Sequence, residues 1–198
     1  DSYHGYDVTD YYDVNPEYGT KSDFKKMVKE AHKRGVRVVI DLVMNHTSRK
    51  HQWFIDSTDP KSSMHDWYVW KDEKPEGWIT FGSKDGPWYP RAGKFYYALF
   101  WEGMPDLNYK NPEVREEMKK VANYWMNSMG VDGFRLDASR YIVEQTKGWD
   151  GGQADSVETL KWWKEFQDNL KESKEGAFTI GEVWAPIKTV SQYYIGGA

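Results

Sequence analysis

Two short apolar runs, each closed by an acidic residue and preceded by a helical pattern, constrain the fold of this chain most. They are residues 133–137 (GFRLD) and 178–182 (FTIGE). Each predicts a buried parallel strand that ends in a carboxylate. If the two strands are neighbours, Asp137 and Glu182 meet at the carboxyl end of the sheet. Active sites lie at that end in barrels of alternating strands and helices, so we expect chemical roles for both acids.

Most of the chain alternates in the same way. The predicted elements, in chain order, are a helix over 23–34, a strand over 36–44, a helix over 112–130, the strand to 137, a helix over 156–173 and the strand to 182. Ser22 is a good N-cap for the first helix, and the nearly all-apolar run 36–44 predicts a strand covered on both faces. Helices between strands predict right-handed crossovers, and hence a parallel sheet in an α/β fold.

One long segment interrupts this alternation. Residues 47–103, nearly sixty positions, show no clear helix and are too long for a connection in a compact α/β unit. We therefore predict three parts: a barrel segment over 1–46, an inserted loop-rich subdomain over 47–103, and a second barrel segment over 104–198. The insertion leaves the carboxyl end of a strand, so we expect it to form one wall of the binding cleft.

The insertion is also rich in aromatic residues, which make up 17% of the whole chain. Two interpretations stay open for the rings between Trp53 and Trp101. Each ring taken alone is most simply part of a small core. As a set, flat amphipathic rings suit the faces of sugars, which carry C–H bonds on one side and hydroxyls at the rim.

Composition excludes several functions. The net charge of −4 and the pI near 5.8 give no basic excess for binding nucleic acid. No apolar run approaches a membrane span, and the N-terminus has no charged-then-apolar signal, so we expect no membrane association. The chain has no cysteine, which excludes disulfides and thiolate metal sites. Localisation stays open between secreted and cytoplasmic, with a lean to secreted.

Four ordered segments resemble signature segments of the α-amylase family of glycoside hydrolases. They are residues 41–46 (DLVMNH), 104–108 (MPDLN), 133–137 (GFRLD) and 181–184 (GEVW), and residues 3–12 resemble the loop after the family's second barrel strand. The MPDLN string is similar to that of members between oligo-1,6-glucosidases and neopullulanases. The resemblance covers the whole chain and implies part of a (β/α)8 TIM barrel, with about three parallel strands and their helices.

The resemblance also implies roles for the two acids and a nearby arginine. Asp137 resembles the nucleophile and Glu182 the general acid/base of a retaining glycosidase, whose carboxyl groups lie about 5 Å apart. Arg135 lies two residues before Asp137 on the same strand face, so we expect it to keep that carboxylate ionised. The simpler interpretations are strand-end caps for the acids and a structural ion pair for Arg135.

Further residues match binding positions of the family. His46 resembles a histidine that binds a sugar hydroxyl, Tyr6 a ring stacked on that sugar, and Asp7 a contact to a terminal hydroxyl in exo-acting members. Asn45 and Asp106 match oxygen ligands of a calcium ion in the family. Calcium prefers oxygen ligands. The simpler interpretations are a satisfied core histidine for His46 and plain hydrogen bonding for the calcium pair.

The sequence departs from the family in two places. At the usual Lys-His pair it has Arg140, which keeps a cation for the leaving-group side, and Tyr141, which puts the histidine contact in doubt. The family's third acid comes from a later Asn-His-Asp segment, which this sequence does not reach. We therefore expect an internal piece of a longer enzyme, inactive alone, whose partners include the missing segments of its own barrel.

The resemblance implies a retaining hydrolase of α-1,4-glucans such as starch and maltodextrins, most simply an α-amylase. Within the same family, α-1,6 cleavage and transfer of the glycosyl group to another sugar stay open. A non-catalytic saccharide-binding member and a purely structural half of a complementing pair also stay open.

Overall fold

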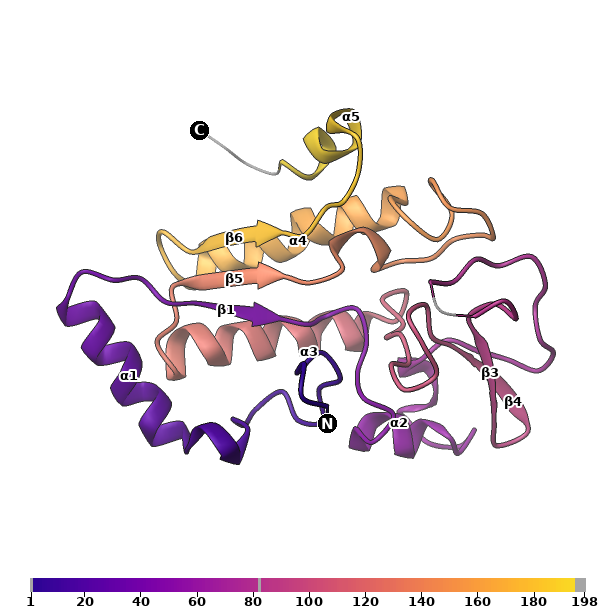
Figure 1. Ribbon diagram of the computed structural model, residues 1–198, viewed down its shortest axis with the longest axis horizontal. Coiled ribbons are helices and arrows are strands. Elements are labelled where there is room, and N and C mark those ends of the chain that lie inside the picture. The colour runs from indigo at the N-terminus through magenta and orange to yellow at the C-terminus, as the bar shows by residue number, and fades with distance from the viewer. Residues whose placement is uncertain (1, 82, 195–198) are drawn as a thin grey trace.

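A computed structural model describes residues 2–81 and 83–194. A parallel sheet runs through its centre in the order β1-β5-β6, with β1 at Val39–Leu42, β5 at Gly133–Leu136 and β6 at Phe178–Gly181. Figure 1 shows the three strands pointing the same way, with helices packed along the sheet and a second group of elements beyond the strands' carboxyl ends. The predicted α/β fold, part of a (β/α)8 barrel, is confirmed.

Helices connect these strands as predicted. The helices are α1 (Lys21–Lys33), α2 (Gln52–Ser57), α3 (Pro112–Asn123) with a π-helical turn (Tyr124–Ser128), α4 (Val157–Ser173) and α5 (Ile187–Val190), with short 3-10 turns at Pro16–Tyr18, His65–Trp67, Ser139–Tyr141 and Ser191–Tyr193. The predicted cap of the first helix was wrong. Thr20, not Ser22, is the N-cap, because Thr20 Oγ1 accepts the Asp23 N–H at 3.2 Å while the Asp23 carboxylate accepts the Thr20 N–H.

The strands are shorter and more exposed than the sequence predicts. The run 36–44 pairs only over Val39–Leu42, and Phe178 and Ile180 of β6 are 54% and 53% exposed. The expectation of strands buried on both sides therefore fails for β1 and β6, because these two are the edges of the sheet in the described residues. Within this sheet only β5 lies between two strands of the described residues. Gly133 lets β6 approach closely, because a Cβ there would lie 1.9 Å from the Phe178 carbonyl oxygen.

Residues 47–103 contain the short α2 and a small antiparallel sheet, in the order β2 (Trp70–Lys71), β4 (Lys94–Tyr97) and β3 (Trp88–Arg91). Figure 1 places α2, β3 and β4 beyond the carboxyl ends of β1, β5 and β6. Many of the aromatic rings are core: Trp67, Tyr68 and Tyr96 are buried in the same cluster as Leu42 and Phe134. The predicted boundaries of the three parts stay predictions. No helix among the described residues is long and apolar enough to cross a membrane.

Candidate active site

Strand register brings the two acids together. Leu136 of β5 pairs with Gly181 of β6, so Asp137 and Glu182 follow at the same level of the sheet. The Glu182 N–H donates to the Leu136 carbonyl at 2.9 Å, which continues the ladder past the strand end. The expectation that neighbouring strands would join these acids is confirmed by this geometry.

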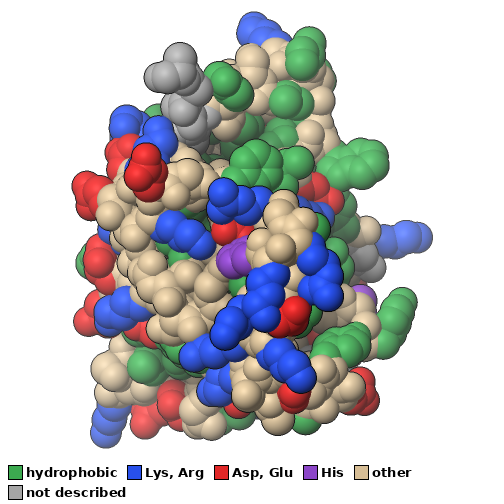
Figure 2. All heavy atoms as spheres, turned by 90° about the vertical axis from the view of Figure 1, so that its left-hand side faces the viewer, with side chains coloured by type: hydrophobic (Ala, Val, Ile, Leu, Met, Phe, Trp, Pro, Cys, Tyr) green, Lys and Arg blue, Asp and Glu red, His purple; other side chains and the backbone are tan. Residues whose placement is uncertain are grey.

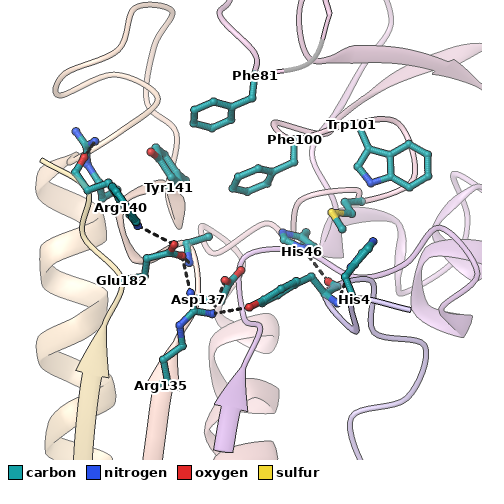
Figure 3. A pocket seen from close by; sticks show the side chains of 14 residues that line it. His4, His46, Phe81, Phe100, Trp101, Arg135, Asp137, Arg140, Tyr141 and Glu182 are labelled. Atoms are coloured by element: carbon teal, nitrogen blue, oxygen red, sulfur yellow. Dashed lines mark hydrogen bonds and ion pairs between the residues drawn. The ribbon is translucent and has the colours of Figure 1, made fainter. Parts of the chain in front are cut away.

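Arg135 lies between the acids. Its Nη1 donates to Asp137 Oδ1 at 2.7 Å, and its Nη2 lies 3.0 Å from Glu182 Oε2. The same guanidinium reaches Asp41 of β1, at 2.9 Å from Oδ1 and 2.7 Å from Oδ2. Figure 3 shows Arg135 below both acids, at the strand ends. One cation is therefore shared by three carboxylates from three adjacent strands.

This sharing governs the ionisation of Asp137. Burial raises the pKa of its carboxyl, Arg135 opposes the rise, and the charges of Glu182 and Asp41 add to it, so the pKa reaches about 6. The predicted pairing with Arg135 is present, but burial outweighs its effect on the pKa. At pH 7 the carboxylate form still dominates, by roughly ten to one.

Glu182 has a donor at each oxygen. Its Oε2 faces Arg135 and also accepts the Ala138 N–H at 3.3 Å, while its Oε1 accepts the indole N–H of Trp184 at 3.0 Å. Ala138 is held at φ +52°, a left-handed conformation that is uncommon for alanine. The bend directly after Asp137 thus turns an N–H toward the second acid.

A cavity of about 600 Å³ opens above these residues. Arg135, Asp137 and Glu182 line it from the sheet, and the rest of its lining comprises His4, Tyr6, His46, Phe81, Phe100, Trp101, Met104, Ala138, Arg140, Tyr141 and Trp184. Phe81 and Phe100 stack at 5.3 Å between ring centroids with 13° between planes, and Tyr141 meets both edge-on. Figure 3 shows these rings facing the carboxylates from above. The insertion therefore does wall the site, as predicted.

Tyr6 and His46 both line the cavity. The Tyr6 hydroxyl lies 3.3 Å from Asp41 Oδ2, and its ring lies 5.7 Å from the Arg135 guanidinium carbon. Burial lowers the pKa of His46 to about 4, so its ring is neutral at pH 7. Its Nε2 bonds the Tyr6 carbonyl at 2.9 Å and its Nδ1 lies 3.3 Å from the Asn45 amide nitrogen. Both ring nitrogens have partners within the chain, and the predicted sugar contacts stay predictions.

Two residues predicted to contact the sugar, Asp7 and Arg140, have other partners in the structure. Asp7 is 1% exposed and its carboxylate accepts the Ser2 N–H and hydroxyl at 2.8 and 2.5 Å. It is not among the described residues that line the cavity, so this geometry offers no support for a sugar contact. Arg140 does line the cavity, but its guanidinium bonds Asp155 and the Trp184 carbonyl.

The calcium pair fits a cation only in part. Asn45 Oδ1 is buried without a hydrogen-bond partner, and burial raises the pKa of Asp106 well above its ordinary value. Both features suit a nearby positive charge. However, the Asn45 amide N–H donates to Asp106 Oδ2 at 2.9 Å, and the described residues hold no group of three or more potential His, Cys, Asp or Glu ligands. The pair alone supplies too few of the six to eight oxygens that calcium takes.

Sequence reasoning missed four contributors: Asp41, Phe81, Asp155 and Trp184. Asp41 carried a usable signal, because a charged residue inside an otherwise apolar strand needs a partner. Asp155 and Phe81 lie in loops whose path only the folded chain defines. Trp184 belongs to a signature segment, but its indole contact with Glu182 depends on the course of the chain after β6.

Known proteins are similar to this sequence over nearly its whole length. A family model described as "Alpha amylase, catalytic domain" matches residues 1–198. Alpha-amylase 3 of Dictyoglomus thermophilum is 45% identical over 196 residues, which are 98% of this chain and 36% of that protein. The 4-alpha-glucanotransferase of Thermotoga neapolitana is 37% identical over 198 residues, covering 97% of this chain and 40% of that protein.

A solved structure agrees. The crystal structure of alpha-amylase from H. orenii superposes with a TM-score of 0.83 at 44% identity, over 97% of this chain and 38% of that one. The chain thus spans well under half of the length of these relatives.

Proposed function

The chain belongs to the α-amylase family of glycoside hydrolases, and from that premise we propose that its parent protein is a retaining hydrolase of α-1,4-linked glucans. The observation that carries the proposal is Arg135 joining Asp137 to Glu182 at the floor of an aromatic-walled cavity. Two carboxylates on one side of a sugar-sized cavity are the groups a retaining mechanism requires.

In the first step, an oxygen of Asp137 attacks the anomeric carbon while the bond from that carbon to the glycosidic oxygen breaks. Glu182 gives its proton to the departing oxygen, and the sugar is left as an ester of Asp137. In the second step, Glu182 takes a proton from water as the water oxygen attacks the same carbon. The ester bond breaks, and Asp137 returns to its carboxylate form.

Arg135 supports both steps electrostatically. It favours the ionised form of Asp137 against the burial that raises its pKa to about 6. It also fixes the spacing of the two acids, because its Nη1 contacts one and its Nη2 the other. The guanidinium fork suits this double contact better than an ammonium would. The third acid of the family is expected outside this chain.

The aromatic wall supports a glucan as substrate. Phe81 and Trp101 line the cavity and are 55% and 40% exposed, so part of each side chain is accessible to a ligand. These two rings are therefore not purely part of the core, and they could also contact a sugar. Relatives named for amylase and glucanotransferase activities support α-glucans as the substrate class without choosing between hydrolysis and transfer. Cleavage of α-1,6 bonds and sugar binding without turnover are the competing proposals.

The deciding experiment uses the full-length parent protein with maltoheptaose. Early release of shorter maltooligosaccharides with the α-configuration, abolished by Asp137→Asn, is the expected result. Early appearance of chains longer than the substrate would instead indicate a transferase. Saccharide binding in calorimetry without any product would indicate a binding protein and overturn the enzymatic proposal.

We also propose that Asn45 and Asp106 contribute to a calcium site in the parent, supported by the unpartnered Asn45 Oδ1. EGTA should lower the melting temperature of the parent, and Asn45→Ala should remove that sensitivity. An unchanged melting temperature would contradict calcium binding.

The remaining barrel segments are proposed partners of this chain. Size-exclusion chromatography of the 198-residue chain with those segments should show a complex, and full activity from the chain alone would contradict the expectation of an incomplete enzyme.

A further inference from the structure

We propose that Arg140, Asp155 and Tyr193 form a clamp that holds the segment after β6 and thereby positions Glu182. The three residues are called the Arg140 clamp below. In this assignment Arg140 is a positioning residue rather than a ligand of the sugar. The inference rests on the proposed glycosidase function, because it concerns the acid/base of that reaction.

The centre of the clamp is a buried ion pair between Arg140 and Asp155, which several hydrogen bonds hold together. Arg140 Nε lies 3.0 and 3.1 Å from the two carboxylate oxygens of Asp155, and Arg140 Nη2 bonds the same carboxylate. Both side chains are 8% exposed. The Asp155 backbone is left-handed, at φ +55°, and its N–H donates to the Arg140 carbonyl at 2.9 Å. Main chain and side chain therefore fix the same pair, which makes its geometry rigid.

Two bonds run from this pair to the segment that follows Glu182. Arg140 Nη1 donates to the Trp184 carbonyl at 2.6 Å, and the Tyr193 hydroxyl donates to Asp155 Oδ1 at 2.6 Å. The segment after Glu182 is thus held at two points, Trp184 and Tyr193. Figure 3 shows the Arg140 side chain beside Glu182, on the side of the cavity away from the insertion.

Trp184 carries the constraint to the acid. Its backbone is held by Arg140, and its indole N–H donates to Glu182 Oε1 at 3.0 Å. Trp184 is 81% exposed, so packing does little to fix its side chain. The two hydrogen bonds at the carbonyl and the indole are what orient this residue toward the acid. Loss of the clamp should therefore loosen Glu182 while the contacts of Asp137 stay in place.

A direct sugar-binding role fits Arg140 less well. Its Nε and Nη2 are engaged by Asp155 and its Nη1 by the Trp184 carbonyl, in a side chain that is 8% exposed. Asp150 is the one further acid among the described residues that pairs with this guanidinium, at 3.7 Å, and its own side chain is 86% exposed. Asp150 therefore provides a matched control: a nearby acid outside the clamp.

The test exploits the dependence of acid catalysis on the leaving group. A sugar leaving group needs a proton from Glu182, whereas a strongly acidic phenol departs without one. In the full-length parent, Asp155→Asn should lower kcat/KM for maltoheptaose about tenfold or more, yet lower kcat/KM for an aryl α-maltoside with an acidic phenol by about twofold at most. Tyr193→Phe should also lower kcat/KM more for maltoheptaose than for the aryl maltoside, by a smaller factor. Asp150→Asn should leave kcat/KM unchanged for both substrates.

Equal losses on both substrates would overturn the clamp's role in positioning the acid, because a general structural defect would affect both alike. If Asp155→Asn does not fold, Tyr193→Phe decides by the same ratio, since it removes one hydrogen bond without exposing a buried charge. A wild-type parent inactive on both substrates would overturn the proposed function and the clamp with it.

Discussion

The charged side chains at the two ends of the central sheet are arranged in opposite ways. At the carboxyl end, one cation, Arg135, is shared by Asp41, Asp137 and Glu182. At the amino end, one carboxylate, that of Asp132, receives three basic side chains: His32 at 2.7 Å, Arg37 at 3.2 Å and Lys174 at 3.4 Å. Figure 2 faces the amino end and shows Lys and Arg side chains gathered there with acidic ones between them.

Asp132 and Asp137 are both largely removed from solvent, yet their pKa values move in opposite directions. For Asp132, burial alone would raise the pKa, but the Val38 N–H, His32, Arg37 and Lys174 outweigh it and lower the pKa to about 2. For Asp137, burial prevails and the pKa rises to about 6. A surplus of donors lowers the pKa of a buried carboxyl and makes its ionised form stabilise the fold, whereas burial without that surplus raises the pKa. This agrees with barrels, where the amino end serves stability and the carboxyl end chemistry.

Asp137→Asn in the parent should have the largest effect. Loss of the proposed nucleophile should reduce kcat by a factor on the order of 10⁴ or more. The melting temperature at pH 7 should stay unchanged or rise. The pKa of the Asp137 carboxyl is about 4 ordinarily and about 6 in the folded protein, so its ionisation destabilises the fold increasingly as the pH rises from 4 to 6. A marked loss of stability would show that the carboxyl end stabilises the fold as the amino end does.

Asp132→Asn should do the reverse. The lowered pKa of Asp132 corresponds to about 2 kcal/mol of stability at neutral pH, in a side chain that is 5% exposed. That stability is fully present above the ordinary pKa of about 4 and is lost as the pH falls toward 2. Denaturation should therefore show a loss of about 2 kcal/mol at pH 7 that shrinks at low pH, with kcat nearly unchanged at low temperature. A large fall in kcat would break the comparison.

Asp41→Asn sharpens the comparison at the carboxyl end. The acid limb of the kcat/KM profile should lie near pH 6, where Asp137 ionises, with activity rising as the pH rises through that value. Removing the Asp41 charge should move this limb to lower pH by about half a pH unit, because one contribution to the raised pKa disappears. A shift to higher pH would mean that Asp41 acts chiefly by orienting Arg135.

Arg37→Gln should have the smallest effect. Its side chain is 80% exposed, so its pair with Asp132 is screened by solvent. We expect a loss of at most about 0.5 kcal/mol, measured by denaturation, and an unchanged pH profile of activity. A loss equal to that of Asp132→Asn would show that Arg37 alone, rather than the group of donors, stabilises this carboxylate.

Local pattern predicted much of this fold. The helix 156–173 and the strands that end at Asp137 and Glu182 follow from the spacing of apolar residues, and α4 begins after Ser156 as a cap should. The sequence predicts Arg135 beside Asp137, because residues two apart share a strand face. The start of the first helix was misjudged, because Ser22 and Thr20 are both good caps and only Thr20 has Asp23 three positions later.

The sequence by itself determined the helices and strands of the central parallel sheet, the position of each acid at a strand end and the family signature. Tertiary structure decided what those acids experience. The sharing of Arg135 with Asp41 requires β1 to lie beside β5. The bonds of Asp155 to Arg140 and to Tyr193 require two loops and a later segment to meet. Backbone pattern is set by neighbours along the chain, but charge and burial act through space, so the pKa of Asp137 and the partners of Glu182 emerge only once the strands are packed.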